Sequence, residues 1–207
     1  MPHHFAEIAF TSTVKKVQEE MGSRSSYARM ESVPDSVNHR LTEAEAGFIA
    51  GRNSFYMATV SETGWPYIQH RGGPTGFVRI LDENTIGFAD FRGNRQYVSV
   101  GNLMNDDRVS LFFMDYPNKT RLKMFGRVRI VGLDEQAVLS RLEMSDYRAR
   151  IERGFVILIE GFDWNCPQHI FERYMPEELS AVTAPLTARI AELEAALARA
   201  IESSPAK

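Results

Sequence analysis

Cysteine is almost absent from this 207-residue sequence, which contains a single one, Cys166. One cysteine excludes an intrachain disulfide framework and is compatible with a reducing compartment. Long apolar runs are also missing: no stretch approaches the roughly 18 residues of a membrane-spanning helix, and the first residues lack a signal-peptide profile. We therefore expect a cytoplasmic protein without a membrane partner.

An excess of charge of one sign is missing too. The 24 Lys and Arg residues face 27 Asp and Glu residues, which gives a net charge of −3. This balance gives no electrostatic reason to expect a nucleic-acid partner, so each arginine is interpreted in its local context. The histidines have no metal-ligand spacing, so no metal site is predicted. They are His3, His4, His39, His70 and His169.

The composition is otherwise that of an ordinary globular chain, with 43% hydrophobic and 25% charged residues. A chain of this length buries roughly 70% of its unfolded surface, so its core needs neither a metal nor a disulfide. We expect an N-terminal helix and arm over residues 1–40, a main domain over 41–175 and a C-terminal amphipathic helix over 176–207.

The N-terminal part carries two helix signals. Residues 11–21 begin with hydroxyl side chains suited to capping, and Gly22 supplies a stop. Thr42 and Glu45 match a capping box, which predicts a short helix that ends at Gly51. Residues 22–40, rich in Ser, Arg and Asn, predict an irregular arm that either wraps a partner subunit or is disordered.

Short apolar runs bounded by turn residues predict strands in the main domain. The runs lie at 55–60, 67–70, 77–81, 85–89, 109–114, 122–131 and 155–159. With helical patterns at 97–104 and 133–147, they indicate an α+β protein centred on a small antiparallel barrel of about six strands. A barrel this small fills its interior with side chains, so a ligand must bind at a rim or at a subunit interface.

The last segment has apolar residues spaced by four, three, four and four positions, which predicts an amphipathic helix. They are Leu186, Ile190, Leu193, Leu197 and Ile201. Such a helix could pack on the body of the protein or pair with its copy. This run holds too few heptads to indicate a coiled coil.

The stretch from Tyr67 to Met114 ends its strands in glycine and arginine rather than in plain turns. Glycine lets backbone N–H groups approach a ligand closely, and the guanidinium fork suits phosphate. Donors also gather beside the start of the helix predicted at 97–104, where an anion is favoured. These donors belong to Arg92, Asn94, Arg95 and Ser99. They predict a site for a phosphorylated ligand at a sheet edge.

A plainer interpretation of the same arginines stays open. In it Arg92 and Arg95 are solvated turn residues that pair with Asp106 or Asp107. Asp90 could orient one of the two arginines or could cap a turn.

Several segments of the main domain resemble one known family. Residues 55–60 followed by 64–68 resemble the opening hairpin of the pyridoxamine 5′-phosphate oxidase-like, flavin-binding split barrels. Residues 88–96 resemble the stretch where that superfamily holds the phosphate of flavin mononucleotide (FMN), and 109–113 continue the pattern. Residues 69–77 and 165–170 look like a subgroup described as predicted flavin-nucleotide-binding proteins.

The resemblance covers roughly residues 40–175 and implies a fold, a cofactor and a partner. The fold is a small six-stranded antiparallel split β-barrel with peripheral helices. The cofactor is FMN, bound at the interface of a homodimer that holds two such sites.

The resemblance also implies roles for single residues. Arg95 and Gln96 fall where the oxidase places an Arg-Lys pair on the phosphate, and Asn94 falls on the serine before that pair. Gln96 removes one charge, for which Arg92 or Lys123 could compensate. Arg121 falls near a position that reaches the flavin from the other subunit.

The substrate motif of the oxidase, Arg-x-His near the C-terminus, has no counterpart here, since Arg173 and Tyr174 do not reproduce it. The resemblance therefore supports cofactor binding better than the vitamin-forming reaction.

Two further groups of residues could meet a flavin ring. The first is Gln69, His70, Arg71 and the backbone of Gly73; the glycines at 72 and 73 could equally form a bend. A lone histidine such as His70 is more often a hydrogen-bonding residue than a proton donor. The second group is Trp164, Gln168 and His169. Packing is the simpler role for Trp164, and a structural role is the simpler one for Cys166.

We expect an FMN-dependent oxidoreductase that acts on a small molecule and takes electrons from a reduced nicotinamide or from that substrate. One alternative is a flavin-binding or carrier protein without turnover. Another is a split barrel that binds a deazaflavin or haem, with His70 or His169 as the axial ligand. No residue is assigned as catalytic.

Overall fold

The computed structural model describes residues 3–31, 38–164 and 167–202; Cys166 and the side chain of Ile201 lie outside this description. The chain forms two compact units, one over residues 1–115 and 120–167 and the other over 116–119 and 168–207. The three-segment division expected from the sequence stays a prediction.

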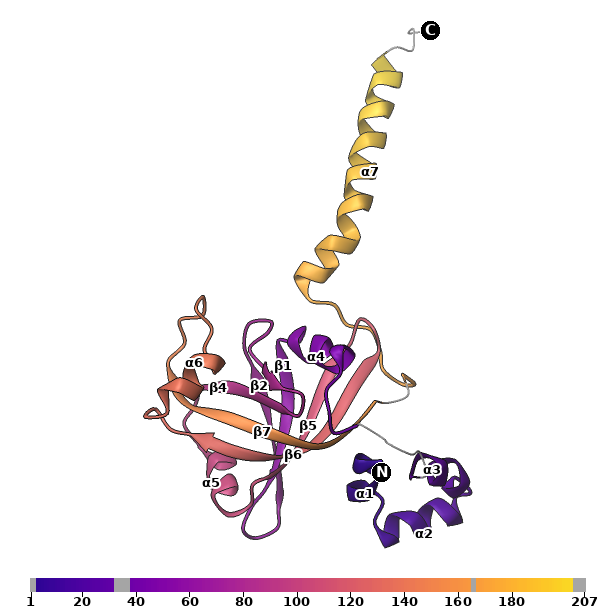
Figure 1. Ribbon diagram of the computed structural model, residues 1–207. Helices are drawn as coiled ribbons and strands as arrows, with labels where there is room; N and C mark the ends of the chain where they lie inside the picture. Colours follow the sequence, from indigo (N-terminus) through magenta and orange to yellow (C-terminus); the bar gives the residue numbers. More distant parts are fainter. Residues whose placement is uncertain (1–2, 32–37, 165–166, 203–207) are drawn as a thin grey trace. The chain divides into compact units, whose positions relative to one another are not determined.

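The first unit is built on one antiparallel sheet with the strand order β2-β1-β5-β6-β7-β4-β3 (Figure 1). Its strands are β1 Ser54–Val60, β2 Pro66–Gly72, β3 Arg79–Asp82, β4 Thr85–Phe91, β5 Arg108–Asp115, β6 Thr120–Val131 and β7 Ile151–Trp164. The α+β class and the antiparallel sheet are confirmed. The expected number of six strands is wrong, because each of the seven apolar runs forms a strand. β3, which has four residues and pairs with β4 alone, is the short edge strand that makes the seventh.

The sheet curls around a core of aromatic side chains. Phe55 of β1 stacks on Phe113 of β5 at 4.8 Å between ring centroids and meets Phe88 of β4 edge-on at 5.3 Å. Phe88 in turn lies 5.1 Å from Phe155 of β7. Strands β1 and β4 are far apart in the sheet order, so these contacts require the sheet to close on itself. The filled interior leaves a ligand to bind at the outside, as expected for a barrel of this size.

The helices lie around this sheet or in the second unit. They are α1 His4–Ala9, α2 Ser12–Glu20, α3 Arg24–Glu31, α4 Glu43–Ala50, α5 Val98–Asn105, α6 Gln136–Leu142 and α7 Pro176–Glu202. Local capping signals were reliable: Thr11 caps α2, and Thr42 and Glu45 form the predicted capping box of α4. No helix among the described residues is long and apolar enough to cross a membrane.

The prediction of an irregular arm over residues 22–40 is wrong for its first part, which is helix α3. Arg24 at its start and Lys15 of α2 both bind Glu31 at its end, the latter at 2.7 Å. These ion pairs join residues that are distant in the sequence, so the local composition could not reveal them.

Helix α1 was not predicted, and it packs on the outer face of β6 and β7. Phe5 is buried and stacks on Phe125 at 4.9 Å. Gly161 of β7 makes this approach possible, since a Cβ at that position would lie 2.6 Å from the backbone nitrogen of Phe5. Backbone fits against backbone here, a contact that hydrophobic periodicity does not signal.

Candidate functional site

A cavity of about 240 Å³ opens where β2, β4 and the start of α5 meet, together with the first residues of β7. Its walls are Tyr67, Gln69, Arg71, Asp90, Phe91, Gly93, Asn94, Arg95, Gln96, Tyr97, Val98, Ser99, Val100 and Glu152. Seven of the fifteen candidate site residues line it: Gln69, Arg71, Asp90, Asn94, Arg95, Gln96 and Ser99. The cavity thus joins the predicted phosphate donors to part of the predicted ring group.

The alternation of β2 decides which of its residues reach the cavity. Successive side chains of a strand point to opposite faces. Tyr67, Gln69 and Arg71 are half-buried and line the cavity, whereas Ile68 and His70 are exposed. His70 instead meets the ring of Tyr56 on the neighbouring strand at 5.6 Å, so it lies on the face of β2 away from the cavity.

Beneath the cavity a buried ion pair joins two strands that are not neighbours in the sheet. Arg71 of β2 donates to Asp90 of β4 at 2.7 Å, and Arg153 of β7 lies 3.4 Å from the other carboxylate oxygen. The pair therefore spans the opening of the split barrel. One interpretation of the sequence had Asp90 orient Arg92 or Arg95. Asp90 instead binds Arg71 and Arg153, because the curl of the sheet brings these two arginines to its carboxylate.

Burial perturbs both members of this pair. It raises the pKa of the Asp90 carboxyl, an effect that Arg71 and Arg153 oppose. It lowers the pKa of the Arg71 guanidinium, which Asp90 opposes. Among the described residues no group accepts a hydrogen bond from the buried Nε of Arg71. An unsatisfied buried donor beside a cavity is a feature that a bound acceptor would complete.

The start of helix α5 forms another wall of the cavity. Tyr97, its N-cap residue, has a left-handed backbone with φ 55° and makes no side-chain cap, and Arg95 is also left-handed with φ 63°. Such strain in residues other than glycine is concentrated at functional sites. Ser99 in the first turn is buried and donates to Gln69 at 2.8 Å. The N–H groups of this first turn favour an anion at the cavity.

Arg95 and Arg92 are held on the other side by an acidic residue of β7. Arg95 donates to the hydroxyl of Tyr97 at 3.2 Å, and that hydroxyl donates to Glu152 at 3.2 Å. The Nε atom of Arg92 lies 3.8 Å from the same carboxylate. Tyr97 and Glu152 were not predicted: Glu152 precedes the apolar run that revealed β7, so its strand position had no local signal.

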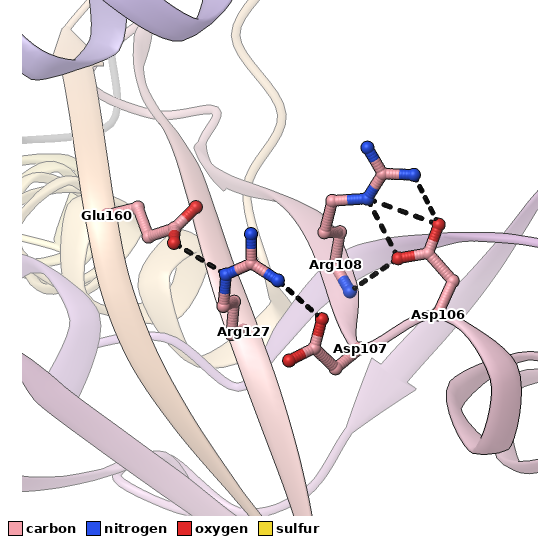
Figure 2. Close-up of polar contacts among 5 residues, drawn as sticks. All are labelled: Asp106, Asp107, Arg108, Arg127 and Glu160. Atoms are coloured by element: carbon pink, nitrogen blue, oxygen red, sulfur yellow. Dashed lines mark hydrogen bonds and ion pairs between the residues drawn. The ribbon is translucent and has the colours of Figure 1, made fainter.

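The alternative partners proposed for these arginines are occupied elsewhere (Figure 2). Asp106 accepts from the backbone and the guanidinium of Arg108, and Asp107 accepts from Arg127 at 2.7 Å. Arg127 also donates to Glu160 at 2.7 Å. The interpretation in which Arg92 and Arg95 pair with Asp106 or Asp107 is therefore wrong.

Charge around the cavity is positive on balance. The charged walls of the cavity are two arginines and two carboxylates, and two further arginines outside the walls bind those carboxylates, which gives the network of described residues an excess of two positive charges. The guanidinium groups belong to Arg71, Arg92, Arg95 and Arg153, and the carboxylates to Asp90 and Glu152. A doubly charged anion would balance this excess.

Other predicted residues have partners away from the cavity. The N–H of Gly73 donates to the carbonyl of Asn53 at 3.0 Å, and a Cβ at Gly73 would lie 2.7 Å from the ring of Phe77, which fits a packed bend. Lys123 pairs with Asp163 at 2.7 Å.

Trp164 shows the packing role that was its simpler interpretation. Its indole N–H donates to Glu45 at 2.8 Å, and its ring packs edge-on against Phe48 at 4.8 Å. Arg121 lies over the ring of Phe112 at 5.6 Å. Gln168 and His169 belong to the second unit, and their place at a flavin site stays a prediction.

Comparison with known proteins gives one match that covers most of the main domain. A sequence model of the family described as Pyridoxamine 5'-phosphate oxidase matches residues 41–172. No curated protein sequence matches the chain.

Three solved structures of similar topology share 15–17% sequence identity with the chain. One is HupZ of Group A Streptococcus, with 16% identity, a TM-score of 0.48 and coverage of 65% of this chain and 99% of that one. Another, from Clostridium acetobutylicum, is related to general stress protein 26 of the pyridoxinephosphate oxidase family, with 15% identity, a TM-score of 0.42 and coverage of 57% and 83%. A third is an F420 reductase, with 17% identity, a TM-score of 0.40 and coverage of 59% and 98%. No conclusion about ligand or activity rests on these likenesses.

Proposed function

The chain belongs to the pyridoxamine 5′-phosphate oxidase family, and from this premise we propose that it binds FMN and acts as a flavin-dependent oxidoreductase on a small molecule. The observation that carries the proposal is the cavity between β2, β4 and α5, where excess positive charge meets a helix start.

The residues of the cavity fit a phosphate group. A phosphate monoester carries about −1.5 to −2 charges at neutral pH, which matches the excess of two positive charges. In the proposal Arg95 and Asn94, together with the first N–H groups of α5, hold the phosphate through charge-assisted hydrogen bonds. Ser99 contributes its backbone N–H, since its hydroxyl donates to Gln69. The buried Nε of Arg71 offers one more donor at the inner end of the cavity.

The volume of the cavity limits how much of the cofactor it can enclose. Sites that enclose a whole small molecule have volumes of roughly 300–1,000 Å³, larger than the 240 Å³ found here. The cavity suits the phosphate tail, and in the proposal the ring extends past Gln69 toward the surface of a second subunit. Apolar surface for a subunit contact lies on the opposite face of β2 and just before this strand, where Ile68 and Trp65 are 63% and 76% exposed.

A homodimer with the cofactor at its interface follows as part of the proposal. In it several predicted residues that do not line the cavity meet the ring bound to the other subunit. They are Arg121, Lys123, Trp164, Gln168 and His169.

A bound flavin would supply the redox chemistry, and the protein would bind, orient and shield it. Arg71 would add a fixed positive charge to the cavity, because Asp90 holds its guanidinium across the barrel opening. Since His70 faces away from the cavity, no proton donor is assigned there.

A binding protein without turnover is the second candidate. The observation in its favour is the lack of the oxidase substrate motif, since Arg173 stacks over Tyr116 at 4.8 Å within the second unit instead of forming it. Stopped-flow reduction by NADH or NADPH separates the two candidates. An oxidoreductase reduces its bound FMN faster than free FMN is reduced, whereas a carrier shows no acceleration.

The cofactor proposal is tested by purifying the full chain, recording its visible spectrum and identifying any released compound by mass. We expect a yellow protein that releases FMN. Its affinity for FMN should exceed its affinity for riboflavin, which lacks the phosphate, by about tenfold or more. Equal affinities for the two flavins, or a colourless protein that ignores added FMN, would contradict the proposal.

A further inference from the structure

Helix α7 carries an apolar stripe that is longer than the sequence pattern indicated. The helix runs unbroken from Pro176 to Glu202, so it begins ten residues before Leu186, where the pattern was recognised. This extension adds Leu179 and Val182 to the stripe. The large apolar side chains from Leu179 to Leu197 are each more than half exposed.

A helix with this surface needs a partner. Most of the stability of a protein helix comes from burying its apolar face, because isolated helices are marginal in water. A stripe of exposed leucine and isoleucine side chains over 27 residues is also larger than the scattered apolar residues of an ordinary surface. We therefore expect another apolar surface to cover the stripe of α7.

The spacing of the stripe identifies the kind of cover. Leu179, Leu186 and Leu193 are seven residues apart, and so are Thr183, Ile190 and Leu197. Each residue of the first series is followed four positions later by one of the second series, and three positions after that by the next of the first. This alternation places the first series at d and the second at a in a heptad repeat. Leucine at the first three d positions and isoleucine at the central a position favour a parallel two-stranded coiled coil; the last d position of the helix is Ala200.

Charge beside the stripe agrees with a parallel pair of identical helices. In this register Arg189 occupies a g position and Glu194 the e position of the next heptad. A parallel dimer brings these two positions together across the interface, with opposite charges, whereas an antiparallel dimer places like charges together. Within one chain Arg189 binds the exposed Glu192 at 2.6 Å, so it can exchange or share that contact.

The proline in the helix does not oppose this packing. Pro185 falls at a c position, on the side of the helix away from the a and d residues. Its ring and the backbone hydrogen bond that it removes therefore lie at the outer surface of such a pair.

From these observations we infer that α7 is a dimerisation helix, which forms a parallel two-stranded coiled coil with α7 of a second copy. The inference is independent of the flavin: it uses residues of the second unit, beyond residue 172 where the family match ends. It gives the chain a means of self-association that does not require the barrel.

Disulfide cross-linking of the full chain tests the arrangement. Cys166 is first replaced by serine, and a single cysteine is then introduced as Leu193→Cys, at a d position. The matched control is Ala195→Cys, on the outer face of the same helix. We expect mild oxidation to link two copies through position 193 about tenfold faster than through position 195, because the coiled coil raises the local thiol concentration.

Orientation is tested by exchanging the charges. Arg189→Glu in the Leu193→Cys chain places like charges across the interface and should reduce cross-linking to the rate of the control. The double change Arg189→Glu with Glu194→Arg should restore it. If Leu193→Cys lowers the helical circular dichroism, Leu186→Cys at the preceding d position replaces it in the same series.

The cross-linking results distinguish a helix that packs on a barrel from one that pairs with a second copy. A helix that packs on a barrel gives slow and equal cross-linking at positions 193 and 195, which would overturn the inference. Cross-linking that ignores both charge changes would overturn the parallel register. The ratio of FMN affinity to riboflavin affinity in the same variants should stay unchanged, because weaker dimerisation affects both flavins alike; this ratio separates a failure of this inference from a failure of the cofactor proposal.

Discussion

At the scale of single residues, the cavity depends on Asp90. Its carboxylate binds Arg71 from β2 and Arg153 from β7, so one side chain fixes three strands at the opening of the barrel. The sequence pointed to the donors of the loop before α5 because they are close together in the chain. It could not reveal that Asp90 binds residues 19 positions earlier and 63 positions later, since that contact exists only after the sheet has curled.

Replacing this carboxylate should be costly. Asp90→Asn leaves the buried guanidinium of Arg71 without its counter-charge and leaves Arg153 with Glu152 alone. Removing one partner of a buried ion pair costs about 3–5 kcal/mol of unfolding free energy. Urea unfolding measures the loss. Asp107→Asn is the control, because Asp107 pairs with Arg127 at an exposed site where about 0–1 kcal/mol is expected. Similar losses in the two variants would show that the buried pair does not support the fold.

A second prediction at this scale concerns the loop after α5 (Figure 2). Arg108 holds the pKa of the Asp106 carboxyl at about 2, below its ordinary value of 3.8. Because the folded value is depressed, the small stabilisation from this exposed pair is complete above about pH 4 and is lost as the pH falls through about 2. Carbon-detected NMR titration should give this value, and Arg108→Ala should return it toward 3.8. An unchanged titration in that variant would show that Arg108 is not the cause.

At the scale of elements, prediction succeeded where the signal was local. The capping box of α4 needs residues three positions apart, and the strands follow from runs of adjacent residues. It failed where an element depends on a distant contact. Helix α3 ends at Glu31, which Lys15 binds, and α1 lies on β7 because Gly161 lets the two backbones approach.

The docking of α1 gives a test at this scale. Gly161→Ala places a Cβ 2.6 Å from the nitrogen of Phe5, so α1 must move away and expose that buried ring. We expect a loss of about 2–3 kcal/mol from the exposed aromatic surface and faster hydrogen exchange in α1. Gly47→Ala is the control, since a Cβ there meets nothing within 4 Å and alanine favours a helix interior. Unchanged exchange in α1 of the Gly161 variant would contradict this packing.

At the scale of the whole molecule, the family and the fold class could be predicted from motifs in the main domain, and the match over residues 41–172 confirms the family. All seven strands follow from apolar runs in the sequence, including the four-residue edge strand β3; only the count of six strands for the barrel was too low. The apolar stripe on α7 begins at Leu179, before Leu186 where the spacing was recognised in the sequence.

An interface site makes FMN affinity depend on protein concentration. If the ring binds between two subunits, dilution that separates the dimer should weaken FMN binding, because ligand and partner stabilise the same state. Sedimentation and fluorescence titration over one dilution series measure both quantities. We expect the two transitions to coincide. Affinity that stays constant while the dimer dissociates would confine the site to one subunit.

The central claim is that the cavity beside α5 binds the phosphate tail of the flavin, and a cycle of two ligands and three proteins tests it most directly. FMN and riboflavin are titrated into the unchanged chain, into Arg95→Ala and into Arg108→Ala, whose arginine is paired with Asp106 outside the cavity. The account predicts that Arg95→Ala weakens FMN by about tenfold or more, that it leaves riboflavin affinity nearly unchanged, and that Arg108→Ala changes neither. An equal loss for both flavins in Arg95→Ala, or no loss for either, would contradict it.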